Sequence, residues 1–199
     1  MKLFRAPRLA GLTFAGGVLL AAAASPPPIA LTLPPGQSIH YAPAENLERI
    51  DVALIDDARE SIDMAAYVLT NWPVMQALAR AARRGVKVRI YLDNGMIGQR
   101  RPSAPFLALL DDPSIEIGVK RPHAPLMHLK SYQIDGRLLR TGAANFSASG
   151  LKKQDNDLLI LNDPAAAAEF RRRFEAIFAA SEPLPSDVGQ RRGFFDPQG

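Results

Sequence analysis

The residues best suited to chemistry lie together in one short stretch, HLKSYQIDGRLLRTGAAN. The stretch contains His128, Lys130, Asp135, Gly142 and Asn145 in the spacing H-x-K-x4-D-x6-G-x-x-N. A neutral imidazole is available near neutral pH and is a competent nucleophile towards phosphorus. A lysine ammonium and an asparagine amide can donate hydrogen bonds to oxygens on which negative charge builds. The stretch therefore joins a candidate nucleophile to groups that bind an anion.

The local structure expected here would bring two of these side chains together. Residues 127–134 and 137–141 are predicted as strands, joined by a turn at Asp135-Gly136. Residues two apart on a strand share a face, so His128 and Lys130 should point to one side while Leu129 packs on the other. A lone histidine on a strand is more often structural, and Asp135 can serve mainly as a turn residue even in an active enzyme.

With this spacing, the chain resembles the phospholipase D superfamily and its HKD motif. It is most similar to the small single-motif members, the secreted bacterial endonucleases and mitochondrial cardiolipin hydrolase. The resemblance follows the element order over roughly residues 38–180, and its specific part is residues 128–157. It implies an α/β domain with a mixed parallel and antiparallel sheet flanked by helices on both faces. It also implies a metal-independent phosphodiesterase with no cofactor, acting through a phosphohistidine.

The resemblance assigns roles to the motif residues. His128 is the expected nucleophile, Lys130 and Asn145 the expected phosphate ligands, and Asp135 and Gly142 the expected supporting residues. One position departs from the family pattern, and one role in that pattern has two candidates. Ala143 stands where the family usually has a serine after the glycine. The carboxylate that members use to orient the histidine matches Asp155 here, with Asp157 as the competitor.

A phosphohistidine route needs a second acid or base, because a leaving oxygen must be protonated and a water activated. The superfamily supplies a second HKD histidine, whereas this chain has one HKD motif and no internal repeat. The expectation is therefore a homodimer with its active site at the two-fold interface. The rival is His123, in the loop KRPHAP, acting within one subunit.

The substrate class is open between nucleic acid and phospholipid. Basic residues predicted in flanking loops favour nucleic acid: Lys120, Arg121, Arg100, Arg101, Lys152 and Lys153. Lys152 and Lys153 could equally be an ordinary solvated helix end. A phospholipase would need apolar surface near the site. The residues that could form it, or could instead belong to the core, are Met96, Ile97, Pro105, Phe106, Leu126 and Met127. A third possibility is a binding module for nucleic acid or membrane that keeps the motif without turnover, and Ala143 is its best support.

Strand-like and helix-like segments alternate before the motif, which predicts an α/β layered domain. Strands are expected at 38–42, 61–69, 86–92, 115–119 and 157–161, in addition to the two around Asp135. Helices are expected at 45–60, 73–84, 104–110 and 165–180, the last with an apolar stripe of phenylalanines. Gly85 should end the second helix, and Asp163 with Pro164 should begin the last.

The first 24 residues have the pattern of a secretory signal, with Lys2, Arg5 and Arg8 before an apolar run. The expected organisation is a signal peptide at 1–24, a linker at 25–36, a catalytic domain at 37–181 and a flexible tail at 182–199. The chain should be exported to the periplasm or secreted; the alternative is an uncleaved membrane anchor. Beyond the signal, 21 basic residues face 20 acidic ones, so net charge does not argue for a polyanion partner.

The composition also bears on metals and disulfides. Cysteine is absent, which excludes disulfides and thiolate metal sites. His40, His123 and His128 are the chain's histidines, and they lack the spacing of a zinc site. No metal constellation is expected.

Overall fold

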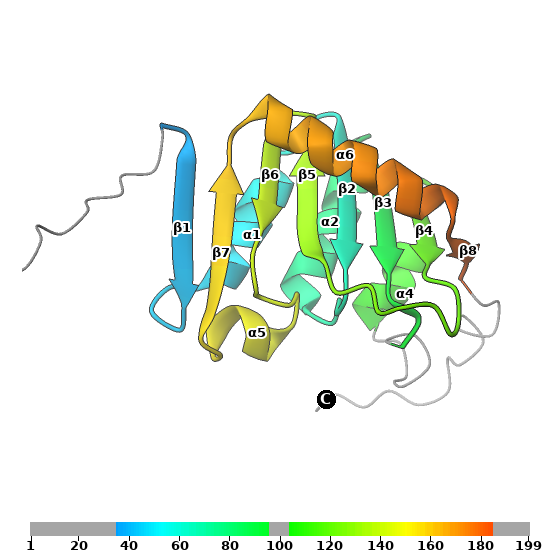
Figure 1. Ribbon diagram of the computed structural model, residues 1–199, viewed down its shortest axis with the longest axis horizontal. Coiled ribbons are helices and arrows are strands. Elements are labelled where there is room, and N and C mark those ends of the chain that lie inside the picture. The colour runs from blue at the N-terminus through cyan, green and yellow to red at the C-terminus, as the bar shows by residue number, and fades with distance from the viewer. Residues whose placement is uncertain (1–34, 96–103, 185–199) are drawn as a thin grey trace, which may run out of the picture. The chain divides into compact units, whose positions relative to one another are not determined.

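A mixed β-sheet forms the centre of the computed structural model, which describes residues 35–95 and 104–184. The described residues belong to one compact unit, Leu33–Gly199. The strands are β1 (Gln37–Ala42), β2 (Ser61–Ala66), β3 (Lys87–Leu92), β4 (Ile115–Val119), β5 (Lys130–Ile134), β6 (Leu138–Thr141), β7 (Asn156–Leu161) and β8 (Glu182–Pro183). Within the described residues they pair in the order β1-β7-β6-β5-β2-β3-β4-β8 (Figure 1). Strands β2, β3 and β4 run parallel, and the other neighbouring pairs are antiparallel.

Helices cover both faces of this sheet. They are α1 (Leu47–Asp56), α2 (Trp72–Arg83), α4 (Ala104–Leu110), α5 (Ala148–Lys152) and α6 (Pro164–Ala179). Helices α1, α2 and α4 lie behind the sheet in Figure 1, whereas α6 crosses its front. The predicted mixed α/β architecture is confirmed. Among the described residues, no helix is both long and apolar enough to cross a membrane.

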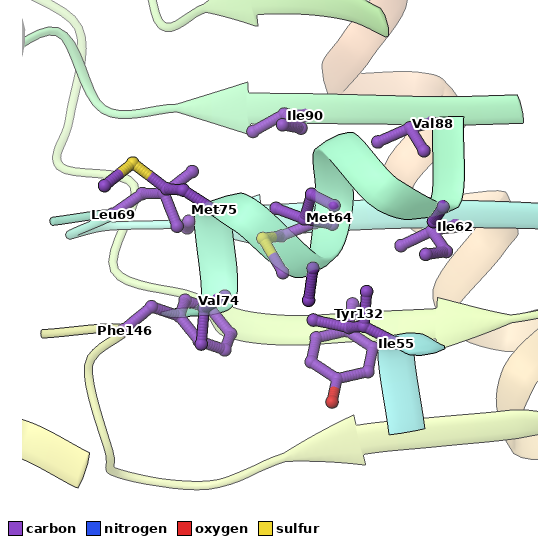
Figure 2. Packing of buried hydrophobic residues seen from close by; sticks show 14 of the residues in the cluster. Ile55, Ile62, Met64, Leu69, Val74, Met75, Val88, Ile90, Tyr132 and Phe146 are labelled. Carbon is purple, nitrogen blue, oxygen red and sulfur yellow. The ribbon is translucent and has the colours of Figure 1, made fainter. Parts of the chain in front are cut away.

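The larger core lies between the sheet and helices α1 and α2. Figure 2 shows how side chains from β2 and β3, such as Met64 and Ile90, meet Met75 of α2 and Ile55 of α1. A smaller cluster on the other face contains Phe174, the fully buried member of the predicted aromatic stripe on α6. Both faces of the central strands are therefore packed, as expected for parallel strands between two helical layers.

Local signals in the sequence set the ends of the helices. Asn46, Asn71 and Asp163 accept hydrogen bonds from backbone N–H groups in the first turns of α1, α2 and α6. Gly85 follows α2 with a φ of 89°, a conformation that glycine adopts without steric cost. Helix α4 and strand β4 have the predicted bounds.

Five predicted elements are longer than the observed ones, and two of these, β3 and β6, differ only by one residue at the start. Helix α1 ends at Asp56 rather than at residue 60. It also lacks residues 45 and 46, because Asn46 caps it and Glu45 instead bonds to His40 and the backbone N–H of Tyr41. Strand β2 ends at Ala66 rather than at residue 69. Strand β5 begins at Lys130 rather than at residue 127.

Some predicted segments fall outside the described residues. They are the signal segment 1–24, most of the linker, residues 185–199, and the candidate substrate residues Met96, Ile97, Arg100 and Arg101. Strand β8 lies within the predicted tail and pairs with β4 through Gly118 and Val119. Ordered structure thus continues past the predicted boundary at residue 181.

Candidate active site

The candidate residues gather at one edge of the sheet, where β2, β3 and β4 end and β5 and β7 begin. We call it the site edge; it is the lower edge of the sheet in Figure 1. In open α/β sheets, ligands bind beyond the carboxyl ends of the parallel strands. The HKD stretch enters the sheet at this edge.

His128 lies two residues before β5, and its side chain is exposed. The Tyr67 N–H donates to the carbonyl of Leu129 at 2.8 Å and so continues the pairing of β2 and β5 by one residue. The imidazole packs against the Tyr67 ring, with centroids 4.7 Å apart and an angle of 56° between the planes. Among the described residues, the imidazole has no hydrogen-bond partner, and both ring nitrogens are available for chemistry.

Lys130 is the first residue of β5 and is only 6% exposed. Its ammonium donates to the carbonyl of His128 at 2.7 Å and lies 5.1 Å from the centre of the Tyr67 ring. Burial lowers the pKa of Lys130 from its ordinary value. His128 and Lys130 thus contact the same aromatic ring, consistent with the shared site predicted. Leu129, predicted to pack on the opposite face, is 38% exposed.

Asn145 lies on the loop between β6 and α5, which is tied to the segment after β2. The carbonyl of Phe146 accepts from the N–H groups of Thr70 and Asn71, both at 2.9 Å. The Asn145 Oδ1 atom is buried and has no hydrogen-bond partner within the described part of the chain. A buried unpaired acceptor is costly, and a phosphate oxygen cannot complete its bonding because it is an acceptor too; the group of Asn145 that can donate to a phosphate is the amide NH2.

Two glycines allow this loop to pack closely. Gly142 has a φ of 144°, and a Cβ there would lie 2.6 Å from the carbonyl oxygen of Asp157. A Cβ at Gly150 would lie 2.7 Å from the carbonyl oxygen of Asn145. Side chains at either position would push the Asn145 loop away from its support. The supporting role predicted for Gly142 thus has a physical basis.

Asp93, at the end of β3, holds the segment that leads into the motif. Its carboxylate is 5% exposed and accepts from the N–H of Met127 at 2.9 Å and from that of Gly95 at 2.9 Å. The N–H of Met127 thus bonds a side chain, and β5 starts at Lys130, later than predicted. Our sequence reasoning missed Asp93 and Tyr67. The available signal was their position, since Asp93 follows the predicted strand 86–92 and Tyr67 lies near the end of the predicted strand 61–69.

The structure gives the three predicted carboxylates separate surroundings. Asp155 is exposed on the turn before β7 and has no contact with His128 in the described structure. Asp157 accepts from the N–H of Ala143 at 2.8 Å, so it supports the Asn145 loop instead. Asp135 lies at the opposite end of β5, where it accepts from the backbone N–H groups of residues 59, 60 and 61. Its φ of 54° fits the predicted turn, and its carboxylate binds the backbone that leads into β2.

With this geometry described, the family can be identified. The family model "Cardiolipin synthase, PLD-like domain" matches residues 52–178, where PLD stands for phospholipase D. The chain belongs to the PLD-like family. The resemblance drawn from the His128 motif is thereby confirmed.

Individual relatives of this PLD-like chain agree with the assignment. A phospholipase D from Rickettsia felis is 31% identical over 130 residues, covering 65% of this chain and 63% of that protein. A mitochondrial cardiolipin hydrolase from Danio rerio is 24% identical over 136 residues, covering 68% and 59%. The crystal structure of Nuc, a phospholipase D family member from Salmonella typhimurium, has a TM-score of 0.67 and 26% identity. That match covers 75% of this chain and 98% of Nuc. The chain spans less than two thirds of the length of these two curated relatives.

The basic residues predicted to bind substrate in the PLD-like chain differ in their availability. Lys120 and Arg121 follow β4 at the site edge, and Arg121 is exposed. Lys153 is also exposed, but Lys152 donates to Glu48 at 2.7 Å. Burial acts to raise the pKa of Glu48, but bonds from Asn71 and Lys152 hold that pKa below its usual value. Lys152 therefore ties α5 to α1, so its ammonium is engaged in the fold.

His123, the predicted rival acid or base, is exposed and has a φ of 61°. It sits in a turn closed by the N–H of Ala124 and the carbonyl of Arg121, with Pro122 at the second position. In the described structure it makes no contact with His128. Across residues 35–95 and 104–184, no group of three or more acidic or histidine side chains could hold a metal ion.

Proposed function

We propose that this PLD-like domain hydrolyses phosphodiesters through a phosphohistidine, with His128 as the nucleophile. The observation that carries the proposal is the meeting of His128 and Lys130 on the Tyr67 ring, beside the Asn145 loop. A ring nitrogen of His128 attacks phosphorus and the P–O bond to one ester group breaks. The departing oxygen takes a proton. Water then attacks the phosphohistidine, giving up a proton and releasing the phosphomonoester and free histidine.

Lys130 and Asn145 stabilise the negative charge that develops on the nonbridging oxygens. The Lys130 ammonium is held by the carbonyl of His128, close to where the phosphate must bind for attack. The ammonium and the amide are already in place before the reaction. Donors that need no rearrangement contribute most to stabilising the charge of a transition state. No divalent ion is required in this scheme.

The second acid or base comes, in our proposal, from His128 of a second copy across a two-fold axis. Support comes from the single HKD motif and from the exposed apolar residues around the nucleophile. Leu126 is 61% exposed and Leu129 is 38% exposed, and both lie within two residues of His128. Burying them against a second copy would shield apolar surface and seal the site from bulk water. The alternative donor is His123 of the same chain.

We propose nucleic acid as the substrate. Arg121 and Lys153 are exposed, and in a dimer each would occur twice along the site. A phosphodiester backbone can follow such a groove without base-specific contacts. The sequence pattern of residues 1–24 supports export as the setting, to the periplasm or outside the cell.

Phospholipid is the second candidate, favoured by the exposure of Leu126 beside the nucleophile. The names of the relatives from Rickettsia felis and Danio rerio also point to lipid. The other predicted apolar candidates count less, because Pro105, Phe106 and Met127 are buried.

The test uses the chain from residue 25 onward, with a chelator present, against single-stranded DNA, duplex DNA, RNA and cardiolipin-containing vesicles. His128→Ala should abolish cleavage and leave binding intact, whereas His123→Ala should cleave at the wild-type rate. Cleavage of vesicles alone would favour the phospholipase. Binding without cleavage of any substrate would reject the enzyme and leave the non-catalytic binding module. Loss of turnover in His123→Ala would reject the two-fold arrangement of the acid.

A further inference from the structure

A buried arginine behind the site contacts the backbone of both phosphate-binding segments. Arg140, on β6, is completely buried. Its Nη1 donates to the carbonyl of Lys130 at 2.8 Å and to that of Ala144 at 3.5 Å. Lys130 carries the ammonium of the site, and Ala144 immediately precedes Asn145. One guanidinium therefore links the two segments that must hold a phosphate.

The link lies where the two strands stop pairing. The pairing of β5 with β6 ends at Tyr132 and Arg140. The pairing of β5 with β2 continues two residues further, to Lys130. Closer to the site edge, the two strands are joined through the side chains of Ser131 and Thr141, at 2.9 Å. The Lys130 carbonyl therefore lacks a β6 ladder partner, and the Arg140 side chain provides the donor.

Arg140 is itself held rigidly from the helical layer. Asp51, on α1, is also completely buried and accepts from Nε at 2.8 Å and from Nη2 at 2.9 Å. The hydroxyl of Tyr132 donates to the same carboxylate at 2.8 Å. The rings of Phe146 and Tyr132, labelled in Figure 2, lie 4.5 and 5.9 Å from the guanidinium carbon. A two-point bond between guanidinium and carboxylate fixes orientation as well as charge.

We propose that Asp51 and Arg140 form a positioning pair for phosphodiester cleavage. By binding the Lys130 and Ala144 carbonyls together, Arg140 sets the separation between the Lys130 ammonium and the Asn145 amide, so that both reach the same phosphate. Asp51 sets the direction of the guanidinium. Neither residue touches the substrate. The inference rests on the proposed function and extends it to residues outside the HKD motif.

A purely structural ion pair would behave differently. Buried ion pairs can often be replaced by apolar side chains of similar volume without loss of stability. An apolar side chain at position 140, however, cannot donate to the two carbonyls. Replacing the whole buried network therefore removes the positioning contact and limits the loss of stability to that from the two carbonyls that lose their donor. The variant Asp51→Leu/Tyr132→Phe/Arg140→Met removes all three polar groups together and leaves none of them unpaired.

The second variant is Arg140→Lys, which keeps the positive charge beside Asp51. A lysine ammonium lacks the planar fork and cannot hold both carboxylate oxygens and both carbonyls. The matched control is Arg89→Lys. Arg89 is also buried, bonds Asp63 and Glu175, and packs on Phe174, but lies under α6 and, among the described residues, has no contact with a site segment.

Each protein is assayed for kcat and KM on bis(p-nitrophenyl) phosphate, for thermal unfolding, and for amide hydrogen exchange. We expect the triple variant to fold, to lose about 100-fold in kcat with little change in KM, and to exchange faster in residues 142–147. Arg140→Lys should lose about tenfold in kcat by the same misplacement. Arg89→Lys should unfold at a lower temperature with wild-type kcat and wild-type exchange in residues 142–147.

A folded triple variant with wild-type kcat and wild-type exchange would overturn the positioning role. If the triple variant does not fold, Arg140→Lys decides by the same two readouts. A wild-type chain that cleaves no phosphodiester would reject the proposed function. In that case the exchange of residues 142–147 still decides whether Arg140 holds the Asn145 loop.

Discussion

Replacing Gly142 with alanine tests how the Asn145 loop is supported. The new Cβ would lie 2.6 Å from the carbonyl oxygen of Asp157, where an ordinary contact begins at 3.4 Å, and 3.1 Å from the Cα of Leu158. These atoms belong to the backbone of β7 and cannot rotate away. The φ of 144° adds a second cost, because L-residues rarely adopt positive φ. Positive φ costs about 1–2 kcal/mol, and forced overpacking costs about 1–3 kcal/mol.

Gly142→Ala should therefore lose about 2–5 kcal/mol of unfolding free energy, or about 4–20 °C in Tm for a domain of this size. The assay is thermal and urea unfolding followed by circular dichroism. Gly85→Ala is the matched control, since Gly85 has a φ of 89° but nothing within 4 Å of its Cβ position. It should lose only the backbone part, about 1–2 kcal/mol. Equal losses in the two variants would refute the collision with β7.

Three further predictions concern individual side chains of the site. Ala143→Ser, which restores the hydroxyl typical of the family at an exposed position, should raise kcat by up to about tenfold without changing Tm, and steady-state kinetics would detect it. Burial lowers the pKa of Lys130, so the ammonium should lose its proton, and kcat/KM should fall, at a pH below the ordinary lysine value of 10.5. In Lys130→Arg, which stays charged, the alkaline fall in the pH profile should disappear while the rate drops. Lys152→Ala breaks the bond to Glu48 and should lower the free energy of unfolding in urea by about 0.5–1 kcal/mol. Lys153→Ala should instead weaken the binding of single-stranded DNA, measured by fluorescence anisotropy, with no change in stability.

The sequence sufficed for those parts of the site that depend on local spacing. The period of two along a strand anticipated that His128 and Lys130 would share a site, although His128 precedes the strand itself. The turn was also recognisable from the pair Asp135-Gly136, because these residue types tolerate positive φ. Both residues do have positive φ in the structure. The phosphate-binding role of Asn145 followed from family spacing alone.

Contacts between distant segments were not predictable from the sequence. Tyr67 reaches His128 because β2 pairs with β5, and no local pattern specifies that pairing. Asp155 was chosen by spacing from the motif, but the turn before β7 directs it into solvent. Asp51 offered a detectable signal, since it lies four residues from Leu47 and from Ile55 and so falls on the buried face of α1. A charge on such a face requires a buried partner, which is Arg140.

The outer strand β8 bears on how the protein avoids uncontrolled association along the edge of its sheet. At one margin, β8 has two residues and contains Pro183, which lacks an N–H to offer to another strand. It covers Gly118 and Val119 of β4. Shortening the chain before residue 182 would uncover backbone N–H and C=O groups along a strand that is otherwise part of the core. Such a truncated protein should polymerise edge to edge even with every motif residue in place, so any shortened form of the protein should retain residues 182–184.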